Sequence, residues 1–139
     1  MSSQPPACTF RYLEGRIKEF VLTEVSRRAV DELFDLTEQI QREAASRNDL
    51  VTQSLPVLID SSVGVQSLNY SMTRLRTVMS EFPETHKSPI AIILPIGPLL
   101  RTISVMMRPI APMRLYIPQG RDEALAWLRA RAEAQSGQR

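Results

Sequence analysis

The chain has 139 residues, of which 43% are hydrophobic and 23% are charged, so it has the size and composition of one globular domain. Its formal net charge is +2, with basic residues scattered among acidic ones, which argues against the gathered basic surface of a nucleic-acid-binding protein. The single Cys8 allows no intramolecular disulfide, and no apolar leader opens the chain, so we expect a cytoplasmic protein. Pro95, Pro98 and Arg101 interrupt the most apolar window, and we therefore expect no transmembrane segment.

The beginning of the chain predicts a β-hairpin. Residues 1–8 form a polar leader that we expect to be flexible. Two β-prone runs follow, at 9–14 and 17–22, and Gly15 between them accepts the positive φ of a tight turn. We expect these runs to be antiparallel strands at the start of a single domain, 9–134, followed by a flexible tail, 135–139.

A long amphipathic helix is predicted over 24–46. Its apolar residues, Ala29, Leu33, Leu36 and Ile40, recur at steps of four, three and four, and Thr23 offers a capping hydroxyl. Charges of both signs occupy the other face, which is typical of a solvated surface. Asn48 and Asp49 then end the helix.

The segment 55–60, Leu-Pro-Val-Leu-Ile-Asp, predicts the central strand of the sheet. Its apolar run is too short for a helix and lacks the alternation of a strand with one wet face. A strand buried on both faces is usually parallel to its neighbours and covered by helices.

The second helix and the next strand follow the same logic. Apolar residues from Leu68 to Phe82 have helical spacing, Ser67 is the expected N-cap, and Pro83 ends the helix. A polar loop, 83–88, precedes a second buried strand that ends at Pro95.

The last third of the chain predicts two helices and one strand. A helix over 98–108 has Pro98 at its first position and is apolar around most of its circumference. The alternating run 113–117 is typical of an edge strand, and a final helix carries Leu125, Trp127 and Leu128. The fold class is therefore α/β, with the order β-β-α-β-α-β-α-β-α, a mixed sheet of about five strands and covering helices.

This succession resembles the STAS-like domains, which include the SpoIIAA-like proteins and the bacterial anti-sigma-factor antagonists. The residues that carry the resemblance are Val57-Leu58-Ile59-Asp60, Ile90-Ala91-Ile92-Ile93, and the closing Leu115-Tyr116-Ile117 with Glu123-Ala124-Leu125-Ala126-Trp127-Leu128. The resemblance implies a non-enzymatic bacterial regulatory or protein-interaction domain. Because certain lipid carriers share the fold, the alternative is a domain that binds a small molecule or a lipid.

The resemblance also implies a phosphorylated serine near the start of the helix after the central strand. Ser67 is the first candidate phospho-acceptor, since a helix N-terminus favours a phosphate, and Ser62 is the second. A capping role alone also explains Ser67, because it has no acidic residue before it and no glycine after it.

The sequence holds no recognisable catalytic or metal-binding set. Ser61 or Ser62 with His86 and Asp60 forms a Ser-His-Asp set on paper, but no nucleophile-elbow sequence surrounds these residues. No spacing of His, Cys or carboxylate residues is typical of a metal site. We therefore expect no enzyme activity, no cofactor and no metal.

The apolar helix 98–108 is the candidate interaction surface. A helix of this kind is either buried in the domain or covered by a partner, and a second copy of the chain is the simplest partner. We expect a homodimer, another protein or a hydrophobic ligand to contact Leu99, Leu100, Arg101, Ile103, Met106, Met107, Arg108 and Ile110.

Overall fold

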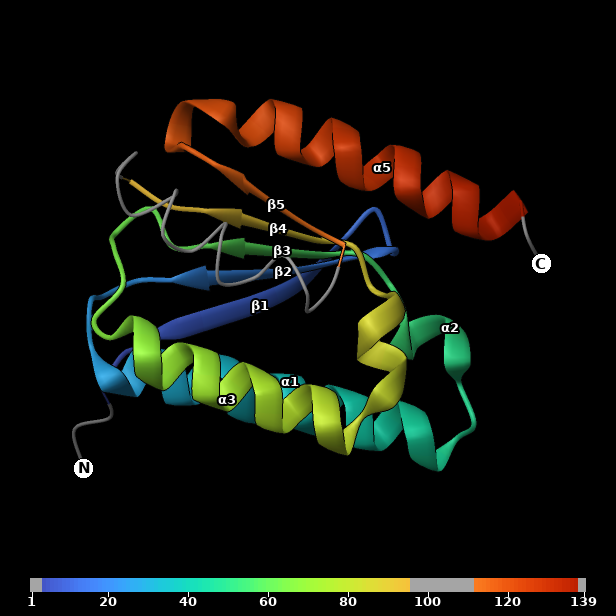
Figure 1. The fold of residues 1–139 in the computed structure, drawn as a ribbon, viewed down its shortest axis with the longest axis horizontal. Helices are drawn as coiled ribbons and strands as arrows, with labels where there is room; N and C mark the ends of the chain where they lie inside the picture. Colours follow the sequence, from blue (N-terminus) through green and yellow to red (C-terminus); the bar gives the residue numbers. More distant parts are fainter. Residues whose placement is uncertain (1–3, 96–111, 138–139) are drawn as a thin grey trace.

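Five strands pair side by side in the order in which they occur along the chain, β1-β2-β3-β4-β5, in the computed structural model, which describes residues 4–95 and 112–137 (Figure 1). The strands are β1 Cys8–Leu13, β2 Ile17–Leu22, β3 Val57–Asp60, β4 Ile90–Ile93 and β5 Met113–Tyr116. β1 is antiparallel to β2, and every other neighbouring pair is parallel. The predicted α/β class, the five-stranded mixed sheet and the central position of 57–60 are confirmed.

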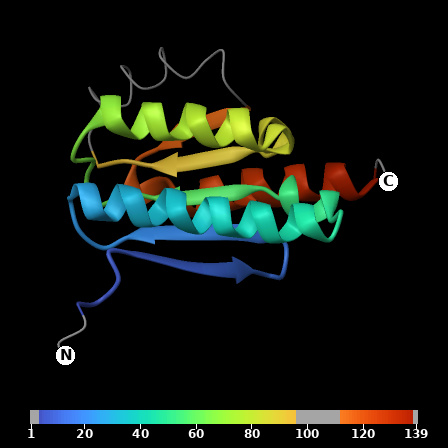
Figure 2. The ribbon, with the colours of Figure 1, turned by 90° about the horizontal axis from the view of Figure 1, so that it is seen from below.

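The helices cover the two faces of the sheet unequally. They are α1 Arg27–Ser46, α2 Leu50–Gln53, α3 Leu68–Glu81 and α5 Arg121–Gly137, with short 3-10 helices η1 Pro83–Lys87 and η2 Pro118–Gly120. Figure 1 shows α1 and α3 on one face and α5 on the other, and Figure 2 shows α1 and α3 lying side by side. Parallel crossovers of constant hand between neighbouring strands place their helices on the same face.

The core is accordingly divided by the sheet. The larger cluster joins α1 and α3 to the strand residues that face them, including Phe20, Leu22 and Ile90. The smaller cluster joins Leu58 and Ile93 to α5. Successive residues of a strand point to opposite faces, so each strand contributes to both clusters.

The hairpin begins earlier in the chain than the sequence pattern predicts. Cys8, expected in a flexible leader, is the first residue of β1 and is buried, because Glu32 of α1 accepts hydrogen bonds from the backbone N–H groups of Ala7 and Cys8. The turn has positive φ at Gly15, as expected, and also at Glu14.

Helix α1 begins three residues after the predicted start. Ser26, rather than Thr23, is the N-cap, and its hydroxyl accepts from the N–H of Ala29 at 3.0 Å. The Thr23 hydroxyl donates to the carbonyl of Pro6 instead. The charged face of α1 is partly engaged as well, since Arg74 of α3 forms ion pairs with three of its acids, Asp31, Asp35 and Glu38.

Three other boundaries differ from the sequence-based expectations. The four-residue helix α2, capped by Asp49, follows α1 where only a loop was expected. Pro83 ends α3 as predicted, but it also begins η1 in place of a loop. Helix α5 continues to Gly137, and Gln135, expected in a flexible tail, donates to the carbonyl of Ser54 at 3.0 Å. The predicted helix 98–108 lies outside the described residues.

Candidate functional site

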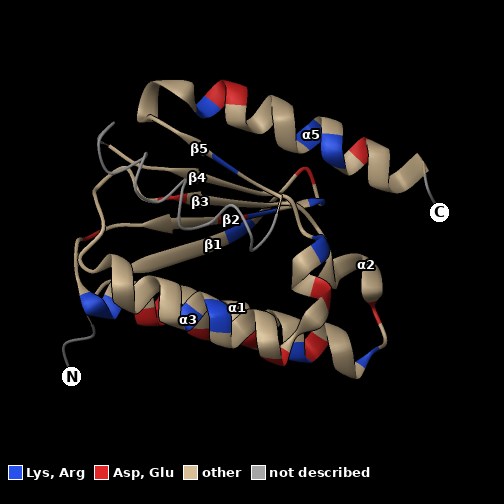
Figure 3. Ribbon diagram, viewed as in Figure 1, with Lys and Arg blue, Asp and Glu red and all other residues tan. Residues whose placement is uncertain are grey.

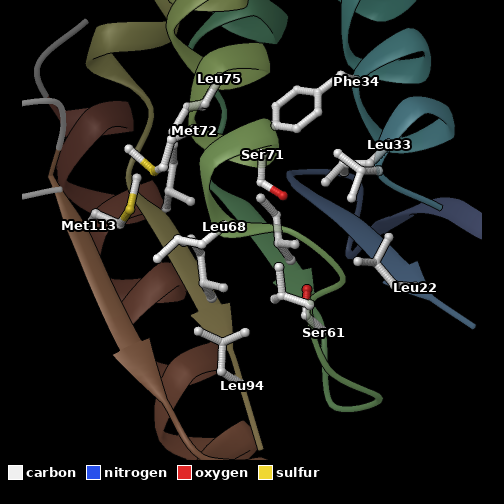
Figure 4. Close-up of a pocket in the computed structure, with 15 residues that line it drawn as sticks. Leu22, Leu33, Phe34, Ser61, Leu68, Ser71, Met72, Leu75, Leu94 and Met113 are labelled. Carbon is white, nitrogen blue, oxygen red and sulfur yellow. The ribbon is translucent and has the colours of Figure 1, made fainter. Parts of the chain in front are cut away.

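An apolar cavity of about 80 Å³ lies between the sheet and the helices α1 and α3 (Figure 4). Its walls are almost entirely hydrocarbon. They are formed by Leu22, Val30, Leu33, Phe34, Ile59, Ser61, Val65, Leu68, Ser71, Met72, Leu75, Ile90, Ile92, Leu94 and Met113. Alternation along β3 and β4 brings Ile59, Ile90 and Ile92 to this face, while Leu58 and Ile93 point toward α5.

Two hydroxyl groups interrupt this apolar lining from opposite sides, Ser61 after β3 and Ser71 on α3 (Figure 4). Ser71 is already satisfied, because its hydroxyl donates to the carbonyl of Ser67 at 2.8 Å. Ser61 is 3% exposed, and its backbone N–H donates to the carbonyl of Ile93 at 2.9 Å. Its side chain borders the cavity, where a ligand can contact the hydroxyl. Among the described residues, no fully buried side-chain oxygen or nitrogen lacks a hydrogen-bond partner.

A second cavity of about 40 Å³ lies on the same face of the sheet and contains the side chain of Lys18. Five residues line both cavities, namely Leu33, Phe34, Ile59, Leu75 and Ile90. The two spaces are therefore neighbours within one layer, separated only by apolar side chains.

Lys18 anchors a buried polar network in the second cavity. It is 3% exposed, and its Nζ donates to Oε1 of Gln41 on α1 at 2.9 Å. The Gln41 amide nitrogen donates in turn to the carbonyl of Gln53 and the hydroxyl of Thr85, each at 2.9 Å. Burial lowers the pKa of Lys18 to about 8, and the negative charge of Asp49 opposes this effect.

The opposite face of the sheet holds a cluster of ionic groups. Glu19, whose side chain is 2% exposed, pairs with both Arg11 and Arg121. Arg121, at the start of α5, also pairs with Asp60 at 3.0 Å. Since each buried carboxylate has a cationic partner, the cluster is satisfied and fixes α5 against the sheet.

The structure separates the serines proposed from the sequence. Ser62 is half-buried, and both its N–H and its hydroxyl donate to Oδ1 of Asp60. Ser67 is the N-cap of α3, as predicted, and its hydroxyl accepts from the N–H of Tyr70 at 3.2 Å. Each hydroxyl therefore forms a hydrogen bond with a residue close to it in the sequence, Ser62 with Asp60 and Ser67 with Tyr70.

The Ser-His-Asp set considered from the sequence is not assembled. Asp60 ends β3 and Ser61 follows it, whereas His86 lies in η1, before β4 begins. Because β3 and β4 are parallel, His86 lies at the opposite end of the sheet from the other two residues. The carboxylate of Asp60 is instead paired with Arg121.

The candidate interaction residues Leu99, Leu100, Arg101, Ile103, Met106, Met107, Arg108 and Ile110 lie outside the described residues. Among residues 4–95 and 112–137, no group of three or more His, Cys, Asp or Glu side chains could hold a metal ion. None of the helices in that part of the chain is long and apolar enough to cross a membrane.

Charges of both signs are interspersed along α1 and α3 (Figure 3).

Comparison with known proteins finds no matching family, no matching curated protein and no matching solved structure. The resemblance to STAS-like domains therefore stays a prediction, and the site must be interpreted from its own chemistry.

The polar groups of this layer, Lys18, Gln41 and Thr85, are not among the site residues predicted from the sequence, and Ser61 was expected there only as a catalytic group. One signal was available in the predicted hairpin. The strand 17–22 contains the adjacent charges Lys18 and Glu19, and a strand paired on both sides must place one such charge on each face of the sheet.

Proposed function

We propose that this domain binds a small, largely apolar molecule in the layer between its sheet and the helices α1 and α3. The observation that carries the proposal is the apolar cavity of about 80 Å³, whose lining contains the hydroxyl-bearing residues Ser61 and Ser71. Binding sites for small molecules are mostly apolar and contain a few polar groups that fix the ligand's orientation.

The volume limits the ligand to a slender molecule. An engineered apolar cavity that binds benzene measures about 150 Å³. The larger cavity alone is smaller than this, and the two neighbouring cavities together approach it. Met72 and Met113 form part of the wall, and their unbranched side chains can repack around a guest (Figure 4). An alkyl chain suits this space better than a rigid ring.

Native mass spectrometry of the purified protein tests the proposal. We expect a bound hydrophobic compound that is released on denaturation. Ser71→Leu fills the cavity and should empty the protein. Thr73→Leu is the matched control, because Thr73 is exposed on the same helix and its hydroxyl makes the same bond to the carbonyl four residues earlier. An empty wild type would indicate that the protein's own side chains fill the space, and equal occupancy in Ser71→Leu would place the compound outside this cavity.

A regulatory interaction domain, the leading expectation from the sequence, is the second candidate. The position of Ser67 favours it, because a half-buried hydroxyl at the N-terminus of the fourteen-residue α3 lies where backbone N–H groups favour a phosphate. Incubation with kinases of the producing cell, followed by peptide mapping, tests this candidate. Phosphate at Ser67 or Ser62 supports a switch, and its absence from both removes it.

Neither candidate function requires catalysis. The STAS-like family, the cytoplasmic location and the homodimer through residues 98–108 all stay predictions. Ligand binding is the first candidate because the cavity gives it a defined location, whereas the residues of the predicted interaction surface lie outside the described residues.

A further inference from the structure

Lys18 is a buried cation whose hydrogen-bonding capacity is mostly unused. An ammonium group has three N–H donors, and Gln41 accepts one of them at 2.9 Å. Within residues 4–95 and 112–137, no carboxylate lies within ion-pairing distance of its Nζ. The other hydroxyl groups that line this cavity are already engaged: Thr85 accepts from the Gln41 amide, and Thr37 and Ser88 donate to the carbonyls of Leu33 and Gln53.

This arrangement differs from that of the other charged group buried in the same strand. Glu19 faces α5 and has two arginine partners, whereas Lys18 faces the cavities and has one neutral acceptor. Burying a charge is costly, and this cost appears as the lowered pKa of Lys18, which the negative charge of Asp49 offsets only in part. A bound anion would stabilise the charged form of Lys18 further.

Lys18 lies at one end of the apolar layer. It is paired in register with Val57, and Ser61 follows Val57 by four residues along β3. Four residues of strand span roughly 13 Å, so Lys18 and Ser61 mark two ends of a narrow apolar space. The five shared lining residues lie between these ends.

We infer that the molecule bound by this domain is a monocarboxylate with an alkyl chain, whose carboxylate pairs with Lys18 and whose chain extends through the apolar layer toward Ser61. This inference rests on the proposed function and deepens it. A single carboxylate matches the single charge of Lys18 and can accept its two remaining N–H donors. A doubly charged phosphate would leave one negative charge without a partner in an apolar environment.

The test is calorimetric titration of the wild-type protein with octanoate and with octan-1-ol, which have the same chain length and different head groups. We expect octanoate to bind at least about tenfold more tightly, because its head group gains a charge-assisted hydrogen bond. Equal affinities, or a preference for octan-1-ol, would overturn the inference while leaving the proposed function intact. No binding of either compound would overturn both.

Two variants assign the preference to Lys18. Lys18→Met retains an unbranched side chain of similar length, and it should lose the preference for octanoate over octan-1-ol. Gln41→Glu places a carboxylate beside Lys18, so the ratio of octanoate affinity to octan-1-ol affinity should fall. Lys87→Met is the control, because Lys87 is exposed on η1. An unchanged preference in Gln41→Glu, confirmed as folded by circular dichroism, would refute the role of Lys18 even if Lys18→Met did not fold.

Discussion

Lys18 and Gln41, which are 23 residues apart in the sequence, form a buried hydrogen bond of 2.9 Å that joins strand β2 to helix α1. Gln41 extends this connection to the carbonyl of Gln53 and to Thr85. One amide therefore satisfies polar groups from three other segments of the chain. Removing it should affect stability far more than its small volume suggests.

Gln41→Leu should lower the free energy of unfolding by about 2 to 4 kcal/mol, because it leaves Lys18 and Thr85 without their partner in a buried position. Urea unfolding measures the change. Combining it with Lys18→Met removes both members of the pair, so the double variant should lose less stability than the two single losses added together. Strictly additive losses would show that the two side chains do not interact.

The lowered pKa of Lys18 predicts an unusual dependence of stability on pH. Above about pH 8, the folded state releases the Lys18 proton, while the unfolded state keeps it up to 10.5. The unfolded state therefore binds more protons, and stability rises with pH in this interval, by at most ~3 kcal/mol for a shift of this size. Below about pH 8 the full cost of the buried charge is present.

Cys8 acts in the opposite direction at higher pH. Burial and the charge of Glu32 raise the pKa of its thiol from 9.0 to about 12, so only the unfolded state loses this proton above pH 9. The clean window therefore lies between about pH 8 and pH 9. We expect unfolding free energies to rise there in the wild type and to stay level in Lys18→Met. A flat wild-type profile would contradict the buried state of Lys18.

Arg121 should be the most important charged residue of α5. Arg121→Met removes a partner of both Glu19 and Asp60 and leaves the buried Glu19 with Arg11 alone, so we expect a loss of about 2 to 4 kcal/mol in unfolding free energy. Arg129→Met is the matched control on the same helix. It removes an exposed ion pair with Glu14 and should cost less than about 1 kcal/mol. Equal losses of unfolding free energy in Arg121→Met and Arg129→Met would indicate that the ion pairs of Arg121 are exposed to solvent.

Ser67→Ala should lower the unfolding free energy by about 1 kcal/mol, because the hydroxyl that caps the N–H of Tyr70 is lost. Ser67→Asp should retain most of the stability, since a carboxylate also accepts this bond and favours a helix N-terminus. Thermal unfolding of both variants checks the result, with Ser80→Ala, exposed on the same helix, as the control. A Ser67→Asp variant as unstable as Ser67→Ala would argue against both the cap and a phosphate at this position.

The strands and the long helices were predictable because their apolar residues repeat over many positions. Helix α2 was not, because four residues are too few to show a helical period. The start of α1 was misplaced because Thr23 and Ser26 both offer a capping hydroxyl, and only the tertiary contact of Thr23 with Pro6 separates them.

The candidate site was harder to predict than the fold. Sequence patterns assign polar residues to the surface, whereas Lys18 and Gln41 are buried through contacts between distant segments. The position of Ser61, in contrast, could have been predicted from the sequence. It follows Ile59 by two residues, so the alternation of the strand already directs it to the face that α1 and α3 cover.

The most direct test of ligand binding between the sheet and the helices α1 and α3 is an amide NMR titration with octan-1-ol. We predict saturable shifts for the amides of Ser61, Ser71, Met72 and Leu94, which surround the larger cavity, and none for Thr73 on the outer side of α3. Ser71→Leu should abolish these shifts. An absence of saturable shifts, or shifts confined to α5 on the other face of the sheet, would contradict the account.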